Sequence, residues 1–213
     1  MKVSKNIKYI IGIDEAGRGP LAGPVSVGVC LLSAKMTRNN FRGIRDSKKL
    51  SEKMRDVWFA KMCEKQEKFN YKKLNTPDAL DFSVTLISNK IIDRRGINFA
   101  IRKAMNDSLK KLQLKNKLKP CECLVLLDGG LRAPAEFPFQ KTIIKGDEKE
   151  FSISLASIAA KVTRDAYMKK LAKKHPLYGF EVHKGYGTAK HITAIKKEGT
   201  SLIHRASFLR NIV

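Results

Sequence analysis

The sequence predicts a mixed α/β domain in which one sheet is covered by helices. Short β-branched or leucine-rich runs closed by glycine are typical of buried strands, and longer segments with helical periodicity separate them. Their order is three strands, helices, two strands and a helix, which differs from the regular alternation of a doubly wound sheet. A chain of 213 residues, 43% of them hydrophobic, is long enough for one such core. We expect a single domain, with an α/β core over about residues 1–175 and a helical extension over about 176–213.

Five segments carry the strand pattern. Tyr9–Ile13 and Val25–Leu32 are apolar runs, and Lys68–Leu74 is a weaker candidate with alternating character. Together they predict that the first strands of the sheet are antiparallel. Leu124–Leu127 and Ile143–Gly146 supply the remaining strands.

Helical periodicity marks the segments between and after these strands. Ser51–Lys65 begins with a capping serine and has apolar residues at helical spacing. Thr76–Leu114 begins with proline at the first helical position and is expected to be mostly helical, with a break at Arg95–Gly96. Phe151–Lys174 predicts a second strong helix, and Ala189–Glu198 a short one in the tail.

The charge predicts a polyanionic partner. Lys and Arg number 43 against 20 Asp and Glu, which gives a formal charge of +23 and a pI of about 10.0. Such a chain binds phosphate backbones strongly and in a salt-sensitive way. A structural RNA-binding protein, a membrane-surface protein and simple solvation remain as alternatives, although no basic amphipathic helix with an aromatic face stands out.

Other compositional features indicate a cytosolic protein without a membrane segment. No apolar stretch approaches the roughly 20 residues of a membrane span, and the N-terminal apolar run is too short for a signal peptide. Four cysteines, at positions 30, 63, 121 and 123, match no zinc pattern and are expected to be reduced thiols.

Three apolar runs each end in an acidic residue, and this pattern predicts a shared carboxylate site. The acids are Asp14 with Glu15, Asp128, and Asp147. Neighbouring strands lie about 5 Å apart, so acids at their ends can meet. Several carboxylates stay ionised together only with a cation, and oxygen ligands favour Mg²⁺ or Mn²⁺ over zinc.

Taken one at a time, these acids have simpler explanations. Asp128 and Asp147 each lie beside glycine, which is ordinary turn chemistry. Asp14 and Glu15 are adjacent, so on an ideal strand only one would face a given site unless the chain bends or ends there. Asp165 lies well inside the Phe151–Lys174 helix, where a salt bridge with a neighbouring lysine is the simpler role.

Three further motifs are candidates for binding phosphate, sugar or base. Gly17, Arg18 and Gly19 form a glycine-rich turn that lets a ligand approach the backbone closely, although such a turn is often only a turn. The segment Asp46–Leu50 places a hydroxyl and two ammonium groups before a helix N-terminus, which favours phosphate, or is simply a capped helix start. His183–Gly187 includes a tyrosine that could stack on a base, or pack in a surface loop.

In order along the chain, these motifs resemble those of the ribonuclease HII family. The six matching blocks are Gly12-Ile13-Asp14-Glu15-Ala16-Gly17-Arg18-Gly19-Pro20-Leu21-Ala22-Gly23-Pro24-Val25, Asp46-Ser47-Lys48-Lys49-Leu50-Ser51, Leu127-Asp128-Gly129, Lys145-Gly146-Asp147, Ser157-Ile158-Ala159-Ala160-Lys161-Val162-Thr163-Arg164-Asp165 and His183-Lys184-Gly185-Tyr186-Gly187-Thr188. Ile203-His204-Arg205-Ala206-Ser207-Phe208 is similar to the family's usual tail. The resemblance departs at Leu155, where the family usually has alanine, and at Leu209-Arg210, where it usually has Gly-Pro.

The resemblance implies a ribonuclease H-like fold, with a central mixed five-stranded sheet flanked by helices and a small C-terminal helical portion. It implies an endoribonuclease that cleaves RNA in RNA·DNA hybrids and nicks duplex DNA on the 5′ side of a single embedded ribonucleotide. Two divalent ions, Mn²⁺ or Mg²⁺, would act in hydrolysis and leave 3′-hydroxyl and 5′-phosphate ends. Ribonucleotide excision repair and RNA primer removal would be its roles. We expect a monomer, and a docking partner at the replication fork stays open.

The resemblance also assigns roles to individual residues. Asp14, Glu15, Asp128 and Asp147 would be the catalytic, metal-binding carboxylates, and Asp165 an auxiliary acid. Gly17, Arg18 and Gly19, together with Tyr186, would read the ribose-to-deoxyribose junction, where the 2′-hydroxyl is the chemical difference. Ser47 and Lys48 would hold backbone phosphates.

Two alternatives to this assignment remain at the level of sequence. Ribonuclease HIII is the nearest rival family, but it typically lacks an arginine between the two glycines. A catalytically silent nucleic-acid-binding protein could share the fold and the charge, although the presence of all four carboxylates argues against it.

Overall fold

The computed structural model describes residues 6–36, 41, 44, 50–68 and 76–210. Its centre is one mixed sheet of five strands, arranged in the order β3-β2-β1-β4-β5. The strands are β1 (Tyr9–Ala16), β2 (Val25–Ser33), β3 (Leu80–Ile87), β4 (Cys123–Asp128) and β5 (Gln140–Ile143). β1 pairs antiparallel with β2 and β2 with β3, whereas β4 runs parallel to both β1 and β5. The mixed five-stranded sheet is therefore confirmed, and so is the antiparallel pairing of the first two predicted strands.

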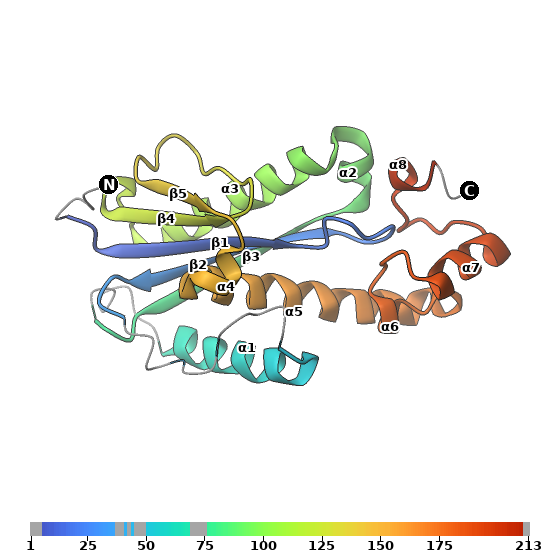
Figure 1. The fold of residues 1–213 in the computed structure, drawn as a ribbon, viewed down its shortest axis with the longest axis horizontal. Helices are drawn as coiled ribbons and strands as arrows, with labels where there is room; N and C mark the ends of the chain where they lie inside the picture. The colour runs from blue at the N-terminus through green and yellow to red at the C-terminus, as the bar shows by residue number, and fades with distance from the viewer. Residues whose placement is uncertain (1–5, 37–40, 42–43, 45–49, 69–75, 211–213) are drawn as a thin grey trace.

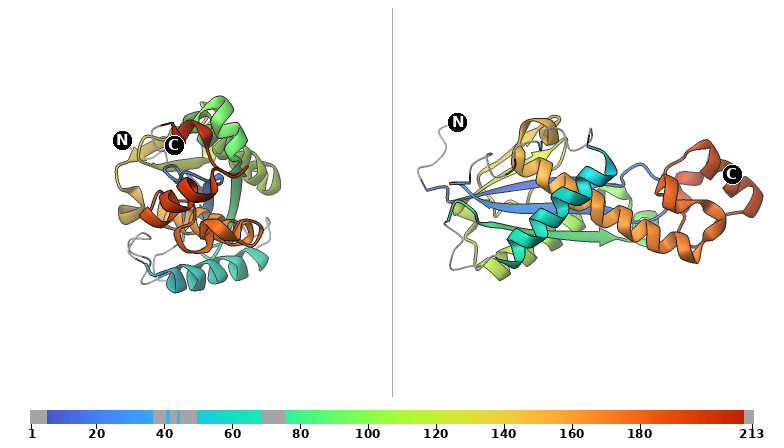
Figure 2. Two further views of the ribbon diagram at one scale, coloured as in Figure 1. Left: turned by 90° about the vertical axis from the view of Figure 1, so that its right-hand side faces the viewer. Right: turned by 90° about the horizontal axis from the view of Figure 1, so that it is seen from below.

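Helices cover both faces of the sheet and continue beyond one end of it (Figures 1 and 2). α2 (Asn89–Arg95) and α3 (Ile97–Asn116) lie over one face, and α4 (Gly146–Lys149) and α5 (Phe151–Lys174) over the other. α1 (Glu52–Glu67) packs against α5 and β3, and Ser51 caps it by accepting the Met54 amide at 3.3 Å. The tail contains α6 (Phe180–His183), α7 (Ala189–Glu198) and α8 (Ala206–Leu209), and begins with a 3₁₀ turn at Pro176–Tyr178. Another 3₁₀ turn, Pro120–Glu122, lies between α3 and β4.

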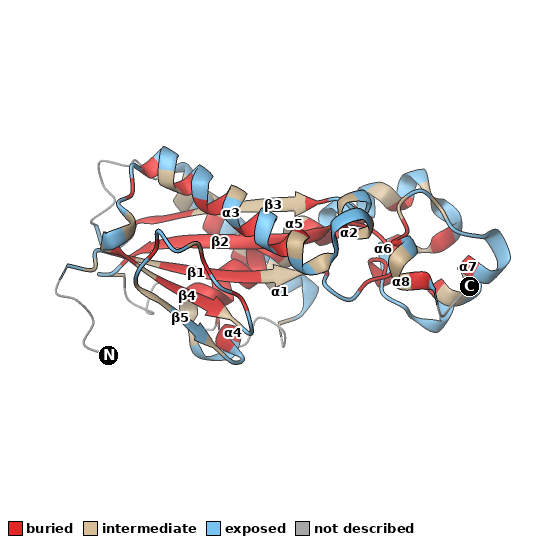
Figure 3. Cartoon of the chain, turned by 90° about the horizontal axis from the view of Figure 1, so that it is seen from above, coloured by how far each residue is buried: buried red, intermediate tan, exposed pale blue. Residues whose placement is uncertain are grey.

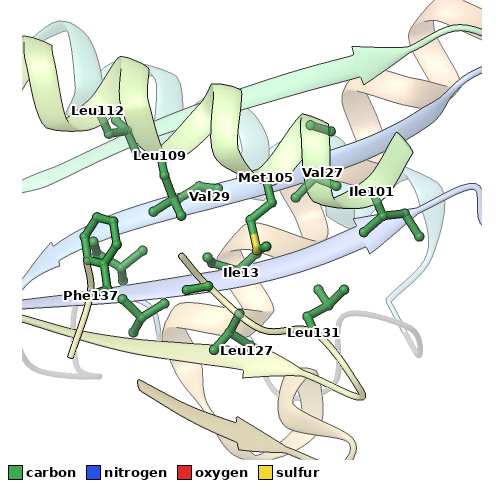
Figure 4. Close-up of a cluster of buried hydrophobic side chains, with 14 of the residues drawn as sticks. Ile13, Val27, Val29, Ile101, Met105, Leu109, Leu112, Leu127, Leu131 and Phe137 are labelled. Carbon is green, nitrogen blue, oxygen red and sulfur yellow. The ribbon is translucent and has the colours of Figure 1, made fainter. Parts of the chain in front are cut away.

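Three apolar clusters stabilise these layers. The largest lies between the sheet and α3, where Met105 and Leu109 point toward β-strand residues such as Ile13 and Val29 (Figure 4). A second cluster lies between the opposite face of the sheet and α5. It contains Leu155, the position at which the family usually has alanine. A third joins the end of α5 to the tail. Figure 3 shows the same division, with buried strands inside and exposed outer faces on the helices.

Two strand glycines allow α5 to lie directly against the sheet. A Cβ on Gly12 would stand 2.1 Å from the carbonyl carbon of Ser152, and one on Gly28 would stand 2.2 Å from the carbonyl oxygen of Ala156. Both contacts are with helix backbone, which cannot move aside without displacing the helix. This close packing brings side chains of α5 close to the carboxyl end of β1.

The region predicted to be helical from Thr76 onward is partly wrong, because Leu80–Ile87 is the edge strand β3. Its apolar and polar residues alternate, and α3 covers its polar face: Ser108 donates to Thr85 at 2.8 Å. The helix prediction holds for α2 and α3, which meet at Gly96. The proposed strand Lys68–Leu74 lies almost entirely outside the described residues.

The fifth strand also differs from its prediction. It spans Gln140–Ile143, and Ile144 beyond it is 76% exposed. Lys145 adopts a left-handed conformation, which turns the chain into the short helix α4. Asp147 therefore lies in a helical turn after the strand rather than at the strand's end. Among the described residues, no helix is both long and apolar enough to cross a bilayer, and the four cysteines are free thiols.

Candidate active site

The register of the two central parallel strands brings Asp14 and Asp128 together. Ile13 on β1 pairs with Leu127 on β4, so the next residue on each strand is an aspartate. Both lie at the carboxyl ends of parallel strands, where ligands bind in open α/β sheets. β1 continues through Ala16, and the chain bends at Gly17, within the glycine-rich segment predicted to supply the bend. Asp14 and Glu15 both line the same pocket.

Asp147 is connected to this pair through its preceding glycine. The Gly146 amide donates to the Asp128 carboxylate at 2.6 Å, which fixes Asp128 against the start of α4. Asp147 itself is buried, and its carbonyl accepts the hydroxyl of Ser154 on α5. Its side chain does not line the pocket that Asp14, Glu15 and Asp128 share.

The electrostatic environment of Asp14 is unfavourable for a negative charge. Burial raises the pKa of Asp14 to about 8, the Ser157 hydroxyl opposes this rise, and the charges of Asp128 and Glu15 add to it. One carboxylate oxygen accepts the Glu15 amide at 2.7 Å, whereas the other, Oδ2, is buried and accepts no hydrogen bond. The site therefore needs a cation if Asp14 is to ionise at neutral pH.

Asp81 on β3 is a buried acid whose surroundings differ from those of Asp14. It is equally buried, but the Lys115 ammonium lies 2.9 Å away and the Asn116 amide donates to it at 2.8 Å. A lysine ammonium thus offsets the charge of Asp81, whereas the charged groups that act on Asp14 are the acids Asp128 and Glu15. A buried carboxylate with a raised pKa and no cationic partner is typical of a functional site.

A pocket of about 410 Å³ joins the acids to the predicted binding turn. Its lining residues come from five parts of the chain: Asp14, Glu15, Ala16, Gly17, Arg18, Gly19, Arg55, Asp128, Ser157, Lys161 and Tyr186. Three carboxylates thus share one concave surface with three cationic side chains, the glycine turn and an aromatic ring. This arrangement suits a phosphate group that carries a sugar on each side.

Two buried arginines hold the glycine turn. Gly17 has φ +87°, and a Cβ there would stand 2.0 Å from Nε of Arg164. Arg164 donates to the Pro24 carbonyl at 2.8 Å, and Arg205 donates to the Gly17 carbonyl at 2.7 Å. The Arg18 side chain instead reaches outward, where it donates to Glu15 at 3.1 Å and to Asn98 on α3 at 2.7 Å.

Tyr186 faces the turn from the tail. Its ring is 40% exposed, and the Lys161 ammonium and the Arg164 guanidinium each lie 5.7 Å from its centroid. Lys161 also forms a 2.8 Å ion pair with Asp165, so this acid has the salt bridge that its position in the helix predicts. Asp165 does not line the pocket but holds a lysine that does.

The predicted phosphate-binding residues Ser47 and Lys48 lie outside the described residues. Sequence reasoning also gave no role to several residues that the fold brings to the site. Arg55, Ser157 and Lys161 line the pocket, and Arg164 and Arg205 hold its turn. Apart from Arg55, they lie within the family-like motifs, but a positive charge buried in a motif does not reveal which carbonyl it contacts.

Comparison with known proteins assigns the family. The sequence profile described as ribonuclease HII matches residues 11–211. The chain belongs to the ribonuclease HII family. The ribonuclease HII of Caldicellulosiruptor bescii is 39% identical over 211 residues, which cover 99% of this chain and 91% of that protein.

Solved structures agree with this fold. The ribonuclease H2 of Pyrococcus horikoshii OT3 has a TM-score of 0.68 and 27% identity, with 96% of each chain covered. Bst-RNase HIII, solved in complex with Mn²⁺, has a TM-score of 0.65 and 18% identity, covering 96% of this chain and 68% of that one. The sheet, its flanking helices and the helical C-terminal part are thus those of the ribonuclease H-like fold. Ribonuclease HII enzymes are metal-dependent hydrolases acting on RNA·DNA hybrids, so an enzyme is favoured over a silent binder.

The carboxylate donors at this site suit a hard divalent cation. Among the described residues, no three Asp, Glu, His or Cys side chains lie close enough together, as they stand, to form a metal-binding group. The buried Oδ2 of Asp14 nevertheless lacks a hydrogen-bond donor, and the Asp128 and Glu15 charges that raise its pKa are themselves oxygen donors. Oxygen-only ligands select Mg²⁺ or Mn²⁺.

Metal affinity is expected to rise with pH, because Asp14 must lose its proton before it can bind a cation. With a pKa of about 8, Asp14 is mostly protonated below that pH in the metal-free protein. Each unit of pH up to about 8 should therefore strengthen Mg²⁺ binding by up to about tenfold. Calorimetric titration at about pH 6, 7 and 9 measures this slope. Asp14→Asn should weaken binding and flatten the slope, whereas an affinity in the wild type that does not change with pH would contradict the assignment.

Proposed function

We propose that this protein nicks duplex DNA on the 5′ side of single embedded ribonucleotides, in addition to cleaving RNA in RNA·DNA hybrids. The observation that supports this most strongly is the shared pocket, in which the acids at the ends of β1 and β4 lie beside the Gly17–Gly19 turn and Tyr186. A hydrolytic centre and a sugar-reading surface would then contact the same phosphodiester.

Asp14, Glu15, Asp128 and Asp147 are proposed to hold two divalent ions, Mn²⁺ or Mg²⁺. The ions would supply Lewis-acid stabilisation of the phosphate and activation of the attacking water. Glu15 is kept in place by Arg18, and Asp128 by the Gly146 amide. Asp165 would act through Lys161, whose ammonium it holds at the pocket where the phosphate would bind. The products would carry 3′-hydroxyl and 5′-phosphate ends.

The turn and Tyr186 are proposed to recognise the junction. The 2′-hydroxyl both donates and accepts hydrogen bonds, and backbone groups at a glycine turn can approach it without side-chain obstruction. The exposed part of the Tyr186 ring is suited to stack on the adjacent sugar or base. Ser47 and Lys48 are proposed to hold backbone phosphates farther along the duplex. We further propose that the protein acts as a monomer and removes embedded ribonucleotides and RNA primers in the cytoplasm.

The test is a labelled DNA duplex with one ribonucleotide, incubated with Mg²⁺ or Mn²⁺ alongside an all-DNA duplex. A metal-dependent nick on the 5′ side of the ribonucleotide, with a 3′-hydroxyl and a 5′-phosphate, supports the proposal. Cleavage of a continuous hybrid without any nick at the single ribonucleotide would sink it.

Tyr186→Ala should weaken junction nicking more than hybrid cleavage, because one stacked ring is removed. Stacking on an aromatic ring contributes about 1–3 kcal/mol, so the ratio of the two kcat/KM values should fall by roughly tenfold or more. Tyr167→Ala is the matched control, since Tyr167 lies on α5 with a similar exposure of 43% but does not line the pocket. Equal losses on both substrates would argue against a sensing role for Tyr186.

A further inference from the structure

Three segments far apart in the sequence meet next to the pocket. Leu21 donates its amide to Gly185 at 2.8 Å, and Arg205 donates its amide to Leu21 at 2.7 Å. Gly23 in turn donates to the Ile203 carbonyl at 2.8 Å. Hydrogen bonds thereby join the tail segment 203–205 to residues 21–23, which follow the glycine turn. Residue 21 is also bonded to Gly185, the residue before Tyr186.

Arg205 fixes the orientation of the glycine turn. Its buried guanidinium donates to the carbonyls of Gly17 at 2.7 Å, Arg18 at 3.0 Å and Gly23 at 2.9 Å. In a trans peptide the carbonyl and the next amide point in opposite directions. Carbonyls directed at Arg205 therefore turn the amides of Arg18 and Gly19 away from it, and these two residues line the pocket.

His204, the neighbour of Arg205, is linked to Tyr186 through His191. Burial lowers the pKa of His191, and it lowers that of His204 to about 4, so both rings are neutral at neutral pH. The Ser201 amide donates to Nδ1 of His204 at 2.9 Å, which places the His204 proton on Nε2. That nitrogen lies 3.0 Å from Nε2 of His191, so the His191 proton is on Nδ1, where it is donated to the Tyr186 carbonyl at 2.8 Å.

Other groups hold these histidines and the residues after Arg205 in place. The His183 ring stacks on His191 with centroids 4.4 Å apart, and it accepts the Gly185 amide through Nδ1. Asp93 on α2 accepts the amides of Ala206 and Ser207 at 3.0 and 2.9 Å, which anchors the residues after Arg205. The tail is thus fixed on both sides of the pair His204 and Arg205.

We propose that His204 and Arg205, with His191 as the connecting ring, are positioning residues that align Tyr186 with the Gly17–Gly19 turn and so set the preference for a ribonucleotide junction. This rests on the proposed junction function. One dipeptide orients both halves of the junction-reading surface: Arg205 orients the turn, and His204 orients the tyrosine backbone through His191.

The test compares kcat/KM on a single-ribonucleotide duplex with kcat/KM on a continuous hybrid of equal length. Arg205→Lys keeps the charge, but one ammonium cannot reproduce a fork that bonds three carbonyls. His191→Leu removes the donor to Tyr186, whereas His191→Asn places an amide N–H near the position of Nδ1. We expect the junction-to-hybrid ratio to fall by roughly tenfold to a hundredfold in Arg205→Lys and His191→Leu, and to recover largely in His191→Asn.

The ratio separates positioning from folding, because both substrates are cut by the same folded fraction. Arg210→Lys, at an exposed position of the tail, is the control and should leave the ratio unchanged. If Arg205→Lys does not fold, the junction-to-hybrid ratios of the two His191 variants test the positioning role. A wild-type preference for the junction with unchanged ratios in the variants would overturn the positioning role alone. A wild-type enzyme that cuts only the hybrid would overturn the junction function itself.

Discussion

Asp128→Asn is expected to lower the rate of hybrid cleavage by about a thousandfold or more while sparing hybrid binding. The substitution removes a charged oxygen donor beside Asp14, and the loss of metal stabilisation in the transition state amounts to several kcal/mol. The amide oxygen of asparagine can still accept the Gly146 amide, so the start of α4 should stay in place. Binding should persist or strengthen, because one negative charge near the phosphate is lost.

Single-turnover cleavage and fluorescence anisotropy measure these two quantities. Asp107→Asn is the matched control, since Asp107 makes the same carboxylate-to-amide change on the exposed side of α3, where its partner is Lys103 at 2.8 Å. Full activity in Asp128→Asn would remove Asp128 from the site. A loss of binding equal to the loss of cleavage would assign it to substrate contact instead.

Gly17→Ala is expected to lower both stability and activity, whereas Gly19→Ala should fold normally. At Gly17 a left-handed φ of +87° coincides with a Cβ position 2.0 Å from Nε of Arg164. Arg164 is fully buried and bonded to the Pro24 carbonyl, so it cannot withdraw easily. The free energy of unfolding should fall by about 3 kcal/mol, which corresponds to roughly 10 °C in Tm.

Gly19 provides the internal comparison within the same turn. A Cβ there meets no atom within 4 Å, and Gly19 is not among the positive-φ glycines. Its substitution should change the free energy of unfolding by less than about 0.5 kcal/mol. Thermal unfolding of the two variants measures the difference, and equal Tm values would contradict the close packing of Arg164 on Gly17.

Local patterns predicted most of the fold. The helices α5 and α7 have the expected bounds, and β1, β2 and β4 follow their apolar runs. The helix prediction is wrong at β3 because the Thr76-Pro77 pair is a good helix start, whereas Leu80–Ile87 has the alternating pattern of a strand. Such alternation is decisive only when a neighbouring strand is available, and pairing with β2 is a long-range contact.

The acidic residues of the site could be predicted from the sequence, but the residues that hold the glycine turn and Tyr186 in place could not. Acids at strand ends predicted that Asp14 and Asp128 meet, since parallel strands align their carboxyl ends. The holding of the Gly17 turn by Arg164 and Arg205 was not predictable, because it needs α5 and the tail to fold back on β1. The link from His204 through His191 to Tyr186 depends likewise on ring orientations set by packing in the tail.

The most direct test of the central claim is anomalous diffraction from a crystal of the protein grown with Mn²⁺. The account predicts manganese peaks at the carboxylates of Asp14 and Asp128, within reach of Glu15 and Asp147, and their loss in Asp14→Asn. Manganese found only at other surface carboxylates, with the Oδ2 atom of Asp14 still without a partner, would contradict the assignment of this pocket as the catalytic metal site.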